Sequence, residues 1–137
     1  MPRRMTPPFS HPVRVYWEDT DAGGVVFYAN YLKFFERART EWLRAAGFGQ
    51  RDLQDRFGVL FVVADTTVRY LAPARLDDEL TVTVRADATR GATLVLEQQA
   101  LHGGNVLAES RISIACVEAG TLKPRRIPTP ILEALNG

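Results

Sequence analysis

The sequence predicts an α+β domain in which a curved antiparallel sheet wraps around one long helix. Two observations lead to this prediction: an apolar stripe at helical spacing over residues 31–45, and a series of long β-rich segments separated by turn residues after it. A single sheet has an apolar face that must be covered, and the helix provides the cover. With 137 residues, the chain suits one such domain and is short for two.

The N-terminal part of the chain predicts a leader, a strand and a tight loop. Residues 1–10 are proline-rich and show no periodicity, so we expect a flexible leader ahead of a single domain over residues 11–137. Val13, Val15 and Trp17 alternate with other positions, which indicates a strand with one buried face. Residues 18–24 read E-D-T-D-A-G-G and combine Asx-turn formers with glycines, so a specifically shaped loop should follow.

The long helix is predicted from five apolar residues that recur at spacings of four and three, with charged residues on another face. Gly47 is a natural helix cap, and residues 50–57 indicate a short additional helix. The stripe consists of Tyr31, Phe35, Ala38, Trp42 and Ala45.

The rest of the chain predicts four strands, over residues 59–70, 79–89, 93–101 and 106–118. The pair Gly103-Gly104 is a two-residue hairpin signal between the last two strands, and residues 131–135 can close the chain as a helical turn. A monomer of this kind leaves sheet edges uncovered. Pairing of edges into a homodimer or homotetramer is the expected remedy.

Composition and charge exclude several classes of function. The chain is 46% apolar and 24% charged, and 17 basic against 16 acidic residues give a net charge of +1, so general nucleic-acid binding is not indicated. The single Cys116 excludes an intrachain disulfide and a cysteine zinc motif. No apolar run approaches the roughly 20 residues of a membrane span, and no signal peptide is recognisable. We therefore expect a cytoplasmic protein without a membrane span.

The loop over residues 18–24 is the richest candidate for chemistry, because it places carboxylates and glycines directly before a helix. The N–H groups at a helix start can polarise a carbonyl, and a nearby carboxylate can attack or activate water. A plain helix cap is the simpler alternative. A calcium loop is also conceivable from Asp19, Asp21 and Gly24, but Asn30 stands where that motif needs a bidentate Glu, and no helix precedes the loop.

The run over residues 14–44, R-V-Y-W-E-D-T-D-A-G-G-V-V-F-Y-A-N-Y-L-K-F-F-E-R-A-R-T-E-W-L-R, resembles the N-terminal signature of hotdog-fold acyl-CoA thioesterases of the 4-hydroxybenzoyl-CoA thioesterase type. The nearest branch is the bacterial Tol-Pal-associated acyl-CoA thioesterases. Residues 68–78, V-R-Y-L-A-P-A-R-L-D-D, also resemble this branch, as do R-G at 90–91 and K-P-R at 123–125. The resemblance implies a hotdog fold and hydrolysis of a small acyl-CoA.

By residue matching, the resemblance implies that Asp21 is the catalytic carboxylate and that the backbone N–H of Tyr28 polarises the thioester carbonyl. Asp21 can act by direct attack or as a general base, and the sequence does not choose between these roles. The Tol-Pal branch usually has a histidine where this chain has Tyr28, whereas the aromatic-acyl branch has a tyrosine. Aromatic acyl groups therefore stay open beside short or medium aliphatic ones.

Other residues are assigned by chemistry or by the same resemblance. Coenzyme A carries phosphates, and Arg90, Lys123 and Arg125 match positions where the family contacts its nucleotide; a solvated surface charge is the alternative for each. Cys116 has the pattern of a buried strand position, and neither His11 nor His102 has the spacing of a ligand pair or a triad. No metal and no cofactor beyond substrate coenzyme A are expected.

The sequence thus favours an acyl-CoA thioesterase whose site is shared between subunits. The alternative is a non-catalytic hotdog scaffold that binds acyl groups or acyl carrier protein in envelope or lipid metabolism. A hotdog dehydratase is a weaker alternative, because those enzymes use a catalytic His beside a Glu or Asp, and neither histidine here is so placed.

Overall fold

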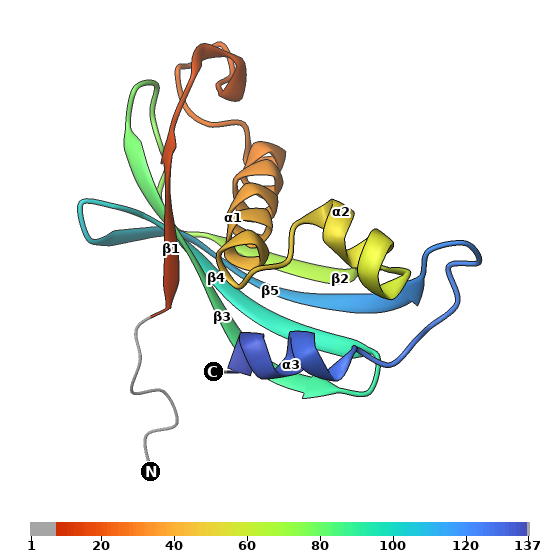
Figure 1. Ribbon diagram of the computed structural model, residues 1–137. Coiled ribbons are helices and arrows are strands. Elements are labelled where there is room, and N and C mark those ends of the chain that lie inside the picture. The colour runs from red at the N-terminus through yellow and green to blue at the C-terminus, as the bar shows by residue number, and fades with distance from the viewer. Residues whose placement is uncertain (1–7, 137) are drawn as a thin grey trace.

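Residues 8–136, which the computed structural model describes, form a five-stranded antiparallel sheet in the order β1-β3-β4-β5-β2, with a long helix packed across one face (Figure 1). The sheet and helix are those that the sequence predicts. The elements in chain order are β1 (Phe9–Arg14), α1 (Tyr31–Ala45), α2 (Gln50–Asp52), β2 (Val59–Tyr70), β3 (Glu79–Arg90), β4 (Thr93–His102), β5 (Asn105–Glu118) and α3 (Thr129–Asn136), with 3-10 turns at Trp17–Asp19 and Tyr28–Asn30 and a π-helical turn at Leu53–Phe57.

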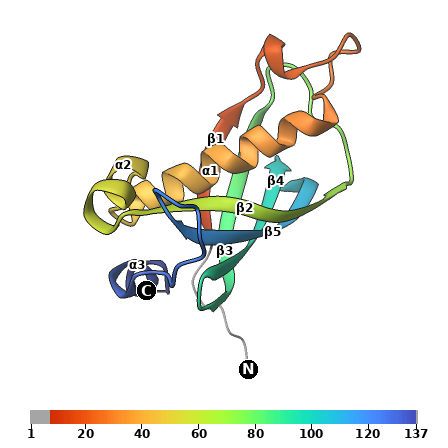
Figure 2. The same ribbon diagram turned by 90° about the vertical axis from the view of Figure 1, so that its right-hand side faces the viewer.

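The sheet bends strongly, so that β2 and β5 run across the direction of β1 and β3 while α1 lies against the sheet (Figure 2). Register shifts interrupt the pairing of β2 with β5 between Val63 and Asp65, and that of β3 with β4 between Ala86 and Ala88. An extra residue in one strand of a pair increases local twist and bends the strand. These irregularities therefore help the long strands to curve around the helix.

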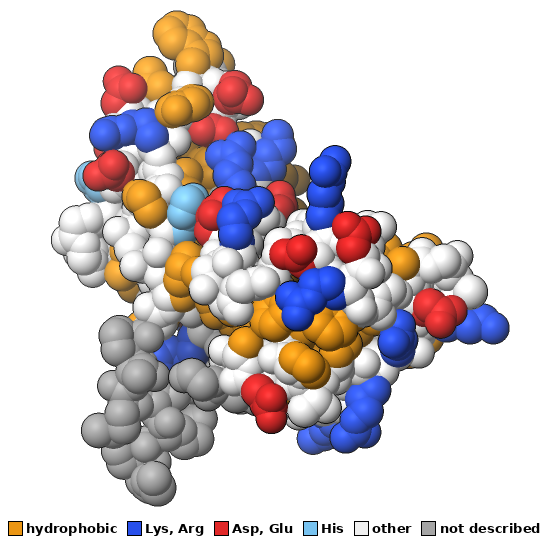
Figure 3. Space-filling view, viewed as in Figure 1, with side chains coloured by type: hydrophobic (Ala, Val, Ile, Leu, Met, Phe, Trp, Pro, Cys, Tyr) orange, Lys and Arg blue, Asp and Glu red, His pale blue; other side chains and the backbone are white. Residues whose placement is uncertain are grey.

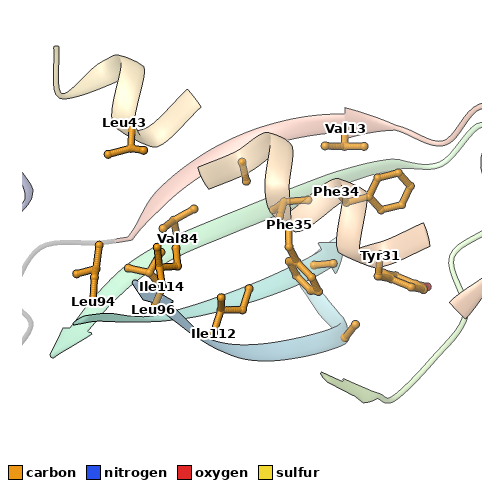
Figure 4. Packing of buried hydrophobic residues seen from close by; sticks show 14 of the residues in the cluster. Val13, Tyr31, Phe34, Phe35, Leu43, Val84, Leu94, Leu96, Ile112 and Ile114 are labelled. Carbon is orange, nitrogen blue, oxygen red and sulfur yellow. The ribbon is translucent and has the colours of Figure 1, made fainter. Parts of the chain in front are cut away.

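The core lies between α1 and the inner face of the sheet. Phe35 on α1 is fully buried, and its ring points toward the strands that carry Leu96 and Ile112 (Figure 4). Along β3 the side chains alternate between buried and less buried positions up to Val84, as a strand with one covered face requires. The core side chains shared between α1 and the three central strands are Phe34, Phe35, Ala38, Leu80, Val82, Val84, Leu94, Leu96, Ile112 and Ile114.

Most predicted elements are confirmed, with small shifts of their ends. The four strands over residues 59–118 are found within one residue of their expected bounds. Gly103 and Gly104 both have positive φ in the turn between β4 and β5. The closing helical turn is confirmed as the longer α3, where Ile131 is fully buried.

The first strand differs from its prediction at both ends. β1 begins at Phe9 and ends at Arg14, and Trp17 lies in a 3-10 turn with 81% of its surface exposed, so its expected place on a buried strand face is wrong. The physical reason is that Val15 exchanges backbone hydrogen bonds with the loop before β3: Val15 N–H donates to Asp78 O, and Val15 O accepts from Asp77 N–H. Residues 1–7 of the expected leader lie outside the described residues.

The apolar stripe of α1 is also rotated slightly from its prediction. Ala45 is exposed and Trp42 is half-buried, whereas Phe34 and Leu43 are buried. The face of α1 that meets the sheet is therefore centred closer to Phe34 and Phe35 than a stripe ending at Ala45 indicates.

Candidate active site

The loop between β1 and α1 contains two aspartates with different surroundings. Asp19 is 3% exposed. Its Oδ2 accepts from Tyr16 N–H at 2.8 Å, its Oδ1 accepts from Asn30 Nδ2 at 2.8 Å, and its carbonyl accepts from Phe27 N–H at 3.1 Å. A buried carboxylate needs such donors, because burial removes its hydration. Asp19 thus ties the chain after β1 to the start of α1.

Asp21, in contrast, is exposed. Its Oδ1 accepts from Gly23 N–H at 2.8 Å, and its backbone closes the loop through Asp21 N–H to Val25 O at 2.9 Å and Gly24 N–H to Asp21 O at 3.0 Å. No hydrogen bond within residues 8–136 engages Oδ2. One oxygen of Asp21 is therefore held by the loop while the other faces solvent.

The two glycines of the loop give the Asp21 carboxylate its space and the turn its shape. A Cβ on Gly23 would lie 3.3 Å from Asp21 Oδ1 and would press on the carboxylate. Gly24 has a φ of +77°, a left-handed conformation that side chains disfavour. The position of Asp21 thus depends on both glycines.

The start of α1 presents open backbone donors beside this loop. A 3-10 turn over Tyr28–Asn30 precedes the helix, and Phe27 O accepts from Asn30 N–H at 2.8 Å. Within the part of the chain that the structure describes, Tyr28 N–H donates to no protein acceptor. Such unpaired N–H groups at the positive end of a helix can stabilise negative charge on an oxygen.

Aromatic rings cluster around this helix start. The ring centroids of Tyr28 and Tyr70 lie 6.2 Å apart, those of Tyr31 and Tyr70 lie 5.6 Å apart, and Phe27 packs on Tyr28 at 4.9 Å. Tyr28 and Phe27 remain 64% and 49% exposed. Hydrophobic side chains gather next to acidic ones at this end of the molecule, the top of the view (Figure 3).

Two tyrosine hydroxyls connect this cluster to neighbouring backbone. Tyr70 OH donates to Tyr28 O at 2.9 Å, and Tyr31 OH accepts from Ala74 N–H at 3.1 Å. Burial raises the pKa of the Tyr31 phenol, an effect that the Ala74 hydrogen bond opposes. The segment after β2 is thus joined to the helix start.

Asn30 and Tyr70 are the residues of this region that sequence reasoning missed. The side chain of Asn30 bonds to Asp19, 11 positions away, and Tyr70 meets Tyr28, 42 positions away. Neither contact leaves a periodic signal in the sequence. Only the residue type of Asn30, an asparagine directly before the predicted helix, could have drawn attention to it.

The three candidate phosphate-binding residues lie at the other end of the sheet. Arg90 ends β3, and the chain around Lys123 and Arg125 follows β5; all three side chains are exposed. Arg125 N–H donates to Cys116 O and Cys116 N–H donates to Ala92 O, so this chain runs beside the β3–β4 hairpin. Lysine and arginine side chains gather over the lower right of Figure 3, where these segments lie.

Within one chain, Asp21 is therefore far from these cations. The Asp21 loop joins the start of β3, since Leu76 N–H donates to Gly24 O at 3.2 Å, whereas Arg90 is the last residue of that 12-residue strand. At about 3.3 Å per residue, the two ends of β3 lie roughly 35 Å apart along the strand. Arg125 also has a local partner, because its guanidinium donates to Phe57 O at 2.7 Å.

The other reactive residues offer no second site. Cys116 is buried, and burial raises the pKa of its thiol, although the nearby Arg125 opposes the rise. His102 Nε2 lies 3.6 Å from Asp78 Oδ1, a pair without a nucleophile. Among residues 8–136 no group of three or more His, Cys, Asp or Glu side chains is placed to hold a metal ion.

A separate groove of about 630 Å³ lies over the central strands and does not include Asp21 or Tyr28. Arg85, Glu97 and Arg111 line it and alternate with the core residues of their strands, so they lie on the sheet face turned away from α1. Arg111 is bonded there to Asp87 at 2.6 Å and to Glu97 at 3.1 Å. The groove is thus a charged outer surface without the nucleophile or the open donors of the Asp21 loop.

Comparisons with known proteins agree with this fold. A family model described as the thioesterase-like superfamily matches residues 15–135. The acyl-CoA thioester hydrolase YbgC of Escherichia coli is 47% identical over 125 residues, covering 90% of this chain and 92% of the relative. The acyl-CoA thioesterase YbgC of Haemophilus influenzae is 44% identical over 128 residues, covering 93% and 94%.

Among solved structures, a probable thioesterase from Bartonella henselae superimposes with a TM-score of 0.83 at 38% identity, covering 87% of this chain and 98% of that one. The chain belongs to the thioesterase-like superfamily. The expected family, the hotdog fold and the class of thioester hydrolase are thereby confirmed. No helix among the described residues is both long and apolar enough to cross a membrane.

Proposed function

We propose that this thioesterase hydrolyses a small acyl-CoA to the free acid and coenzyme A, with Asp21 as the reacting carboxylate and Tyr28 N–H as the donor to the thioester carbonyl. The observation that carries the proposal is the exposed Asp21 carboxylate, held by Gly23 N–H at 2.8 Å in the loop that leads to the open donors of the helix start. The relatives named as acyl-CoA thioesterases support the substrate class.

Two routes from this geometry give the same products. In one, an Asp21 oxygen attacks the thioester carbon, the carbon–sulfur bond breaks, and coenzyme A leaves as the thiolate. Water then cleaves the mixed anhydride, which restores the carboxylate and supplies the proton for the thiolate. In the other, Asp21 accepts a proton from the water that attacks the same carbon, and this proton goes to the thiolate.

Both routes place negative charge on the former carbonyl oxygen, where an N–H at a helix start stabilises it. A thiolate is a good leaving group, so this scheme needs no strong general acid, and coenzyme A enters only as part of the substrate. Mass spectrometry of rapidly quenched enzyme distinguishes the routes, because only the first acylates Asp21.

We further propose that Arg90, Lys123 and Arg125 of one subunit bind the phosphates of the coenzyme A whose thioester lies at Asp21 of a neighbouring subunit. The separation of these cations from Asp21 along β3 supports an active site shared between subunits of a homodimer or homotetramer. The outer edge of β2 supports such pairing, since Val62 and Val63 on this last strand of the sheet are 40% and 51% exposed.

Thiol release from a panel of short-chain, long-chain and benzoyl-type CoA thioesters, with matched acyl carrier protein thioesters, tests the proposal. Asp21→Asn should lower kcat by about 10²- to 10⁴-fold with an unchanged melting temperature. Asp77→Asn is the matched control, because Asp77 is an exposed carboxylate in the neighbouring loop and asparagine tolerates its φ of +71°. Full turnover by the Asp21→Asn protein would exclude the assigned role.

The same panel separates the alternatives. Folded wild-type protein that binds acyl thioesters without releasing thiol would indicate an acyl-binding or acyl-carrier-binding scaffold. Preference for benzoyl-type over aliphatic groups would assign the acyl class, and fractionation of cells would test the proposed cytoplasmic location.

A further inference from the structure

The hydroxyl of Tyr70 links the end of β2 to the carbonyl of Tyr28, the first residue of the 3-10 turn that leads into α1. Tyr70 OH donates to Tyr28 O at 2.9 Å. Tyr70 is the last residue of β2, and the following N–H groups of Leu71 and Ala72 both donate to Leu107 O, at 2.8 and 3.1 Å. Its backbone is therefore fixed to β5, and the phenol extends from a rigid support.

Tyr28 is held on both sides by different parts of the molecule. On its N-terminal side, Phe27 N–H donates to Asp19 O and Phe27 O accepts from Asn30 N–H, which fixes the peptide group that carries Tyr28 N–H. On its C-terminal side, Tyr70 fixes the carbonyl. The two restraints together limit rotation about the Tyr28 backbone, in a 3-10 turn whose hydrogen bonds are weaker than those of an α-helix.

We propose that Tyr70 is a positioning residue for thioester hydrolysis: its hydroxyl holds the Tyr28 backbone so that Tyr28 N–H points at the carbonyl oxygen of the bound thioester. This inference rests on the proposed function of Asp21 and Tyr28. Stabilisation of the developing oxyanion depends on donors that are already oriented before the reaction. Without the Tyr70 bond, the Tyr28–Ala29 peptide group can rotate and shift Asn30, whose N–H holds Phe27 O and with it the peptide group that carries Tyr28 N–H. The substrate would then still bind, but Tyr28 N–H would point away from it for part of the time.

The local environment keeps the Tyr70 hydroxyl available as a donor. Burial raises the pKa of the Tyr70 phenol and the neighbouring Tyr28 phenol adds to the rise, so the hydroxyl stays protonated at neutral pH. The ring itself packs edge-on against Tyr28 and Tyr31. Removing only the oxygen therefore leaves the aromatic contacts in place.

Steady-state kinetics of Tyr70→Phe on the best substrate of the panel tests the proposal. Loss of one oriented hydrogen bond should lower kcat about five- to tenfold, with KM within about twofold of wild type. Tyr16→Phe is the matched control: Tyr16 is 61% exposed, and its kcat and KM should not change. An unchanged kcat for Tyr70→Phe, or a change in KM alone, would overturn the proposal.

Hydrogen exchange separates failure of this inference from failure of the proposed function. The amides of Phe27 and Asn30, which are hydrogen-bonded to Asp19 O and Phe27 O, should exchange faster in Tyr70→Phe than in wild type, whether or not a substrate has been found, while the amides of β4 stay equally protected. Equal exchange at Phe27 and Asn30 contradicts the inference. A wild-type protein inactive on every thioester contradicts only the proposed function.

Incorporation of a fluorinated tyrosine at position 70 provides a second variant that keeps the ring and the fold. Ring fluorination lowers the pKa of the phenol, so that the hydroxyl ionises at a lower pH than in wild type, and the phenolate cannot donate to Tyr28 O. The kcat should then fall as pH rises through that pKa, a limb that the same substitution at Tyr16 should lack. A kcat profile identical to wild type would count against Tyr70.

Discussion

At the scale of single residues, two chemically similar carboxylates of the Asp21 loop differ in how deeply they are buried. Asp19 is 3% exposed and accepts from two donors, whereas Asp21 is exposed and accepts from one. A buried carboxylate whose oxygens are both engaged is poorly placed to attack a substrate, and its loss disturbs the loop itself. These differences support the proposal that Asp21 is the reacting carboxylate and that Asp19 holds the shape of the loop.

The buried contact between Asp19 and Asn30 predicts a large effect of a small change. Asn30→Ala leaves Asp19 Oδ1 without its side-chain donor, and an unsatisfied buried acceptor costs about 1–3 kcal/mol. Chemical denaturation should therefore show that the free energy of unfolding is lower by that amount. The kcat should also fall, because the loop is no longer tied to the helix start. Asn105→Ala, at the exposed first residue of β5, is the control and should be nearly neutral; equal stability of both variants would argue against this role of Asn30.

At the scale of elements, the sequence predicts what depends on local periodicity. The strands over residues 59–118 and the helix Tyr31–Ala45 carry strong patterns, and the structure confirms them. Trp17 continues the alternation of Val13 and Val15 but lies in a 3-10 turn, because the partners of Val15 are backbone groups of residues 77 and 78, more than 60 positions away. Alternation alone cannot indicate where a strand loses its neighbour.

The end of α1 offers a test of backbone conformation without side-chain contacts. Gly47 has a φ of +98°, and a Cβ there would meet nothing within 4 Å; Gly120 is equally open but has no positive φ. Gly47→Ala should therefore lower the free energy of unfolding by about 1–2 kcal/mol, whereas Gly120→Ala should be neutral or slightly stabilising. Thermal or denaturant melts of both proteins check this, and equal changes would mean that strain at Gly47 is relieved by rearrangement of the helix end.

At the scale of the whole molecule, the candidate site is only partly predictable from the sequence. Asp21 and Tyr28 lie seven positions apart along the chain. A single sequence motif therefore covers both residues and predicts that they lie in one loop and the helix start that follows it. Arg90, Lys123 and Arg125 come together because the chain after β5 runs beside the β3–β4 hairpin. Their distance from Asp21 follows from the length and direction of β3, which no single motif contains.

The proposal of a site shared between subunits predicts that two defective proteins restore each other. Asp21→Asn lacks the reacting carboxylate, and a double variant of Arg90→Ala and Lys123→Ala lacks two exposed cations while keeping Arg125, whose guanidinium bonds to Phe57 O. In a mixed dimer, one site then combines an intact Asp21 from one chain with intact cations from the other. Random mixing by co-refolding should recover about a quarter of wild-type kcat/KM, since half of the dimers are mixed and half of their sites are complete.

Activity that stays at the mean of the two separate variants would instead mean that each site uses the cations of its own chain or none. Mixing Asp21→Asn with itself at doubled concentration controls for simple concentration effects. Native mass spectrometry after mixing verifies that mixed dimers have formed, because the two variants differ in subunit mass, so a lack of recovery contradicts the shared site and leaves the role of Asp21 untouched. The expected recovery requires that the end of β3 that carries Arg90 in one subunit approach the Asp21 loop of another, an arrangement that the open edge of β2 allows.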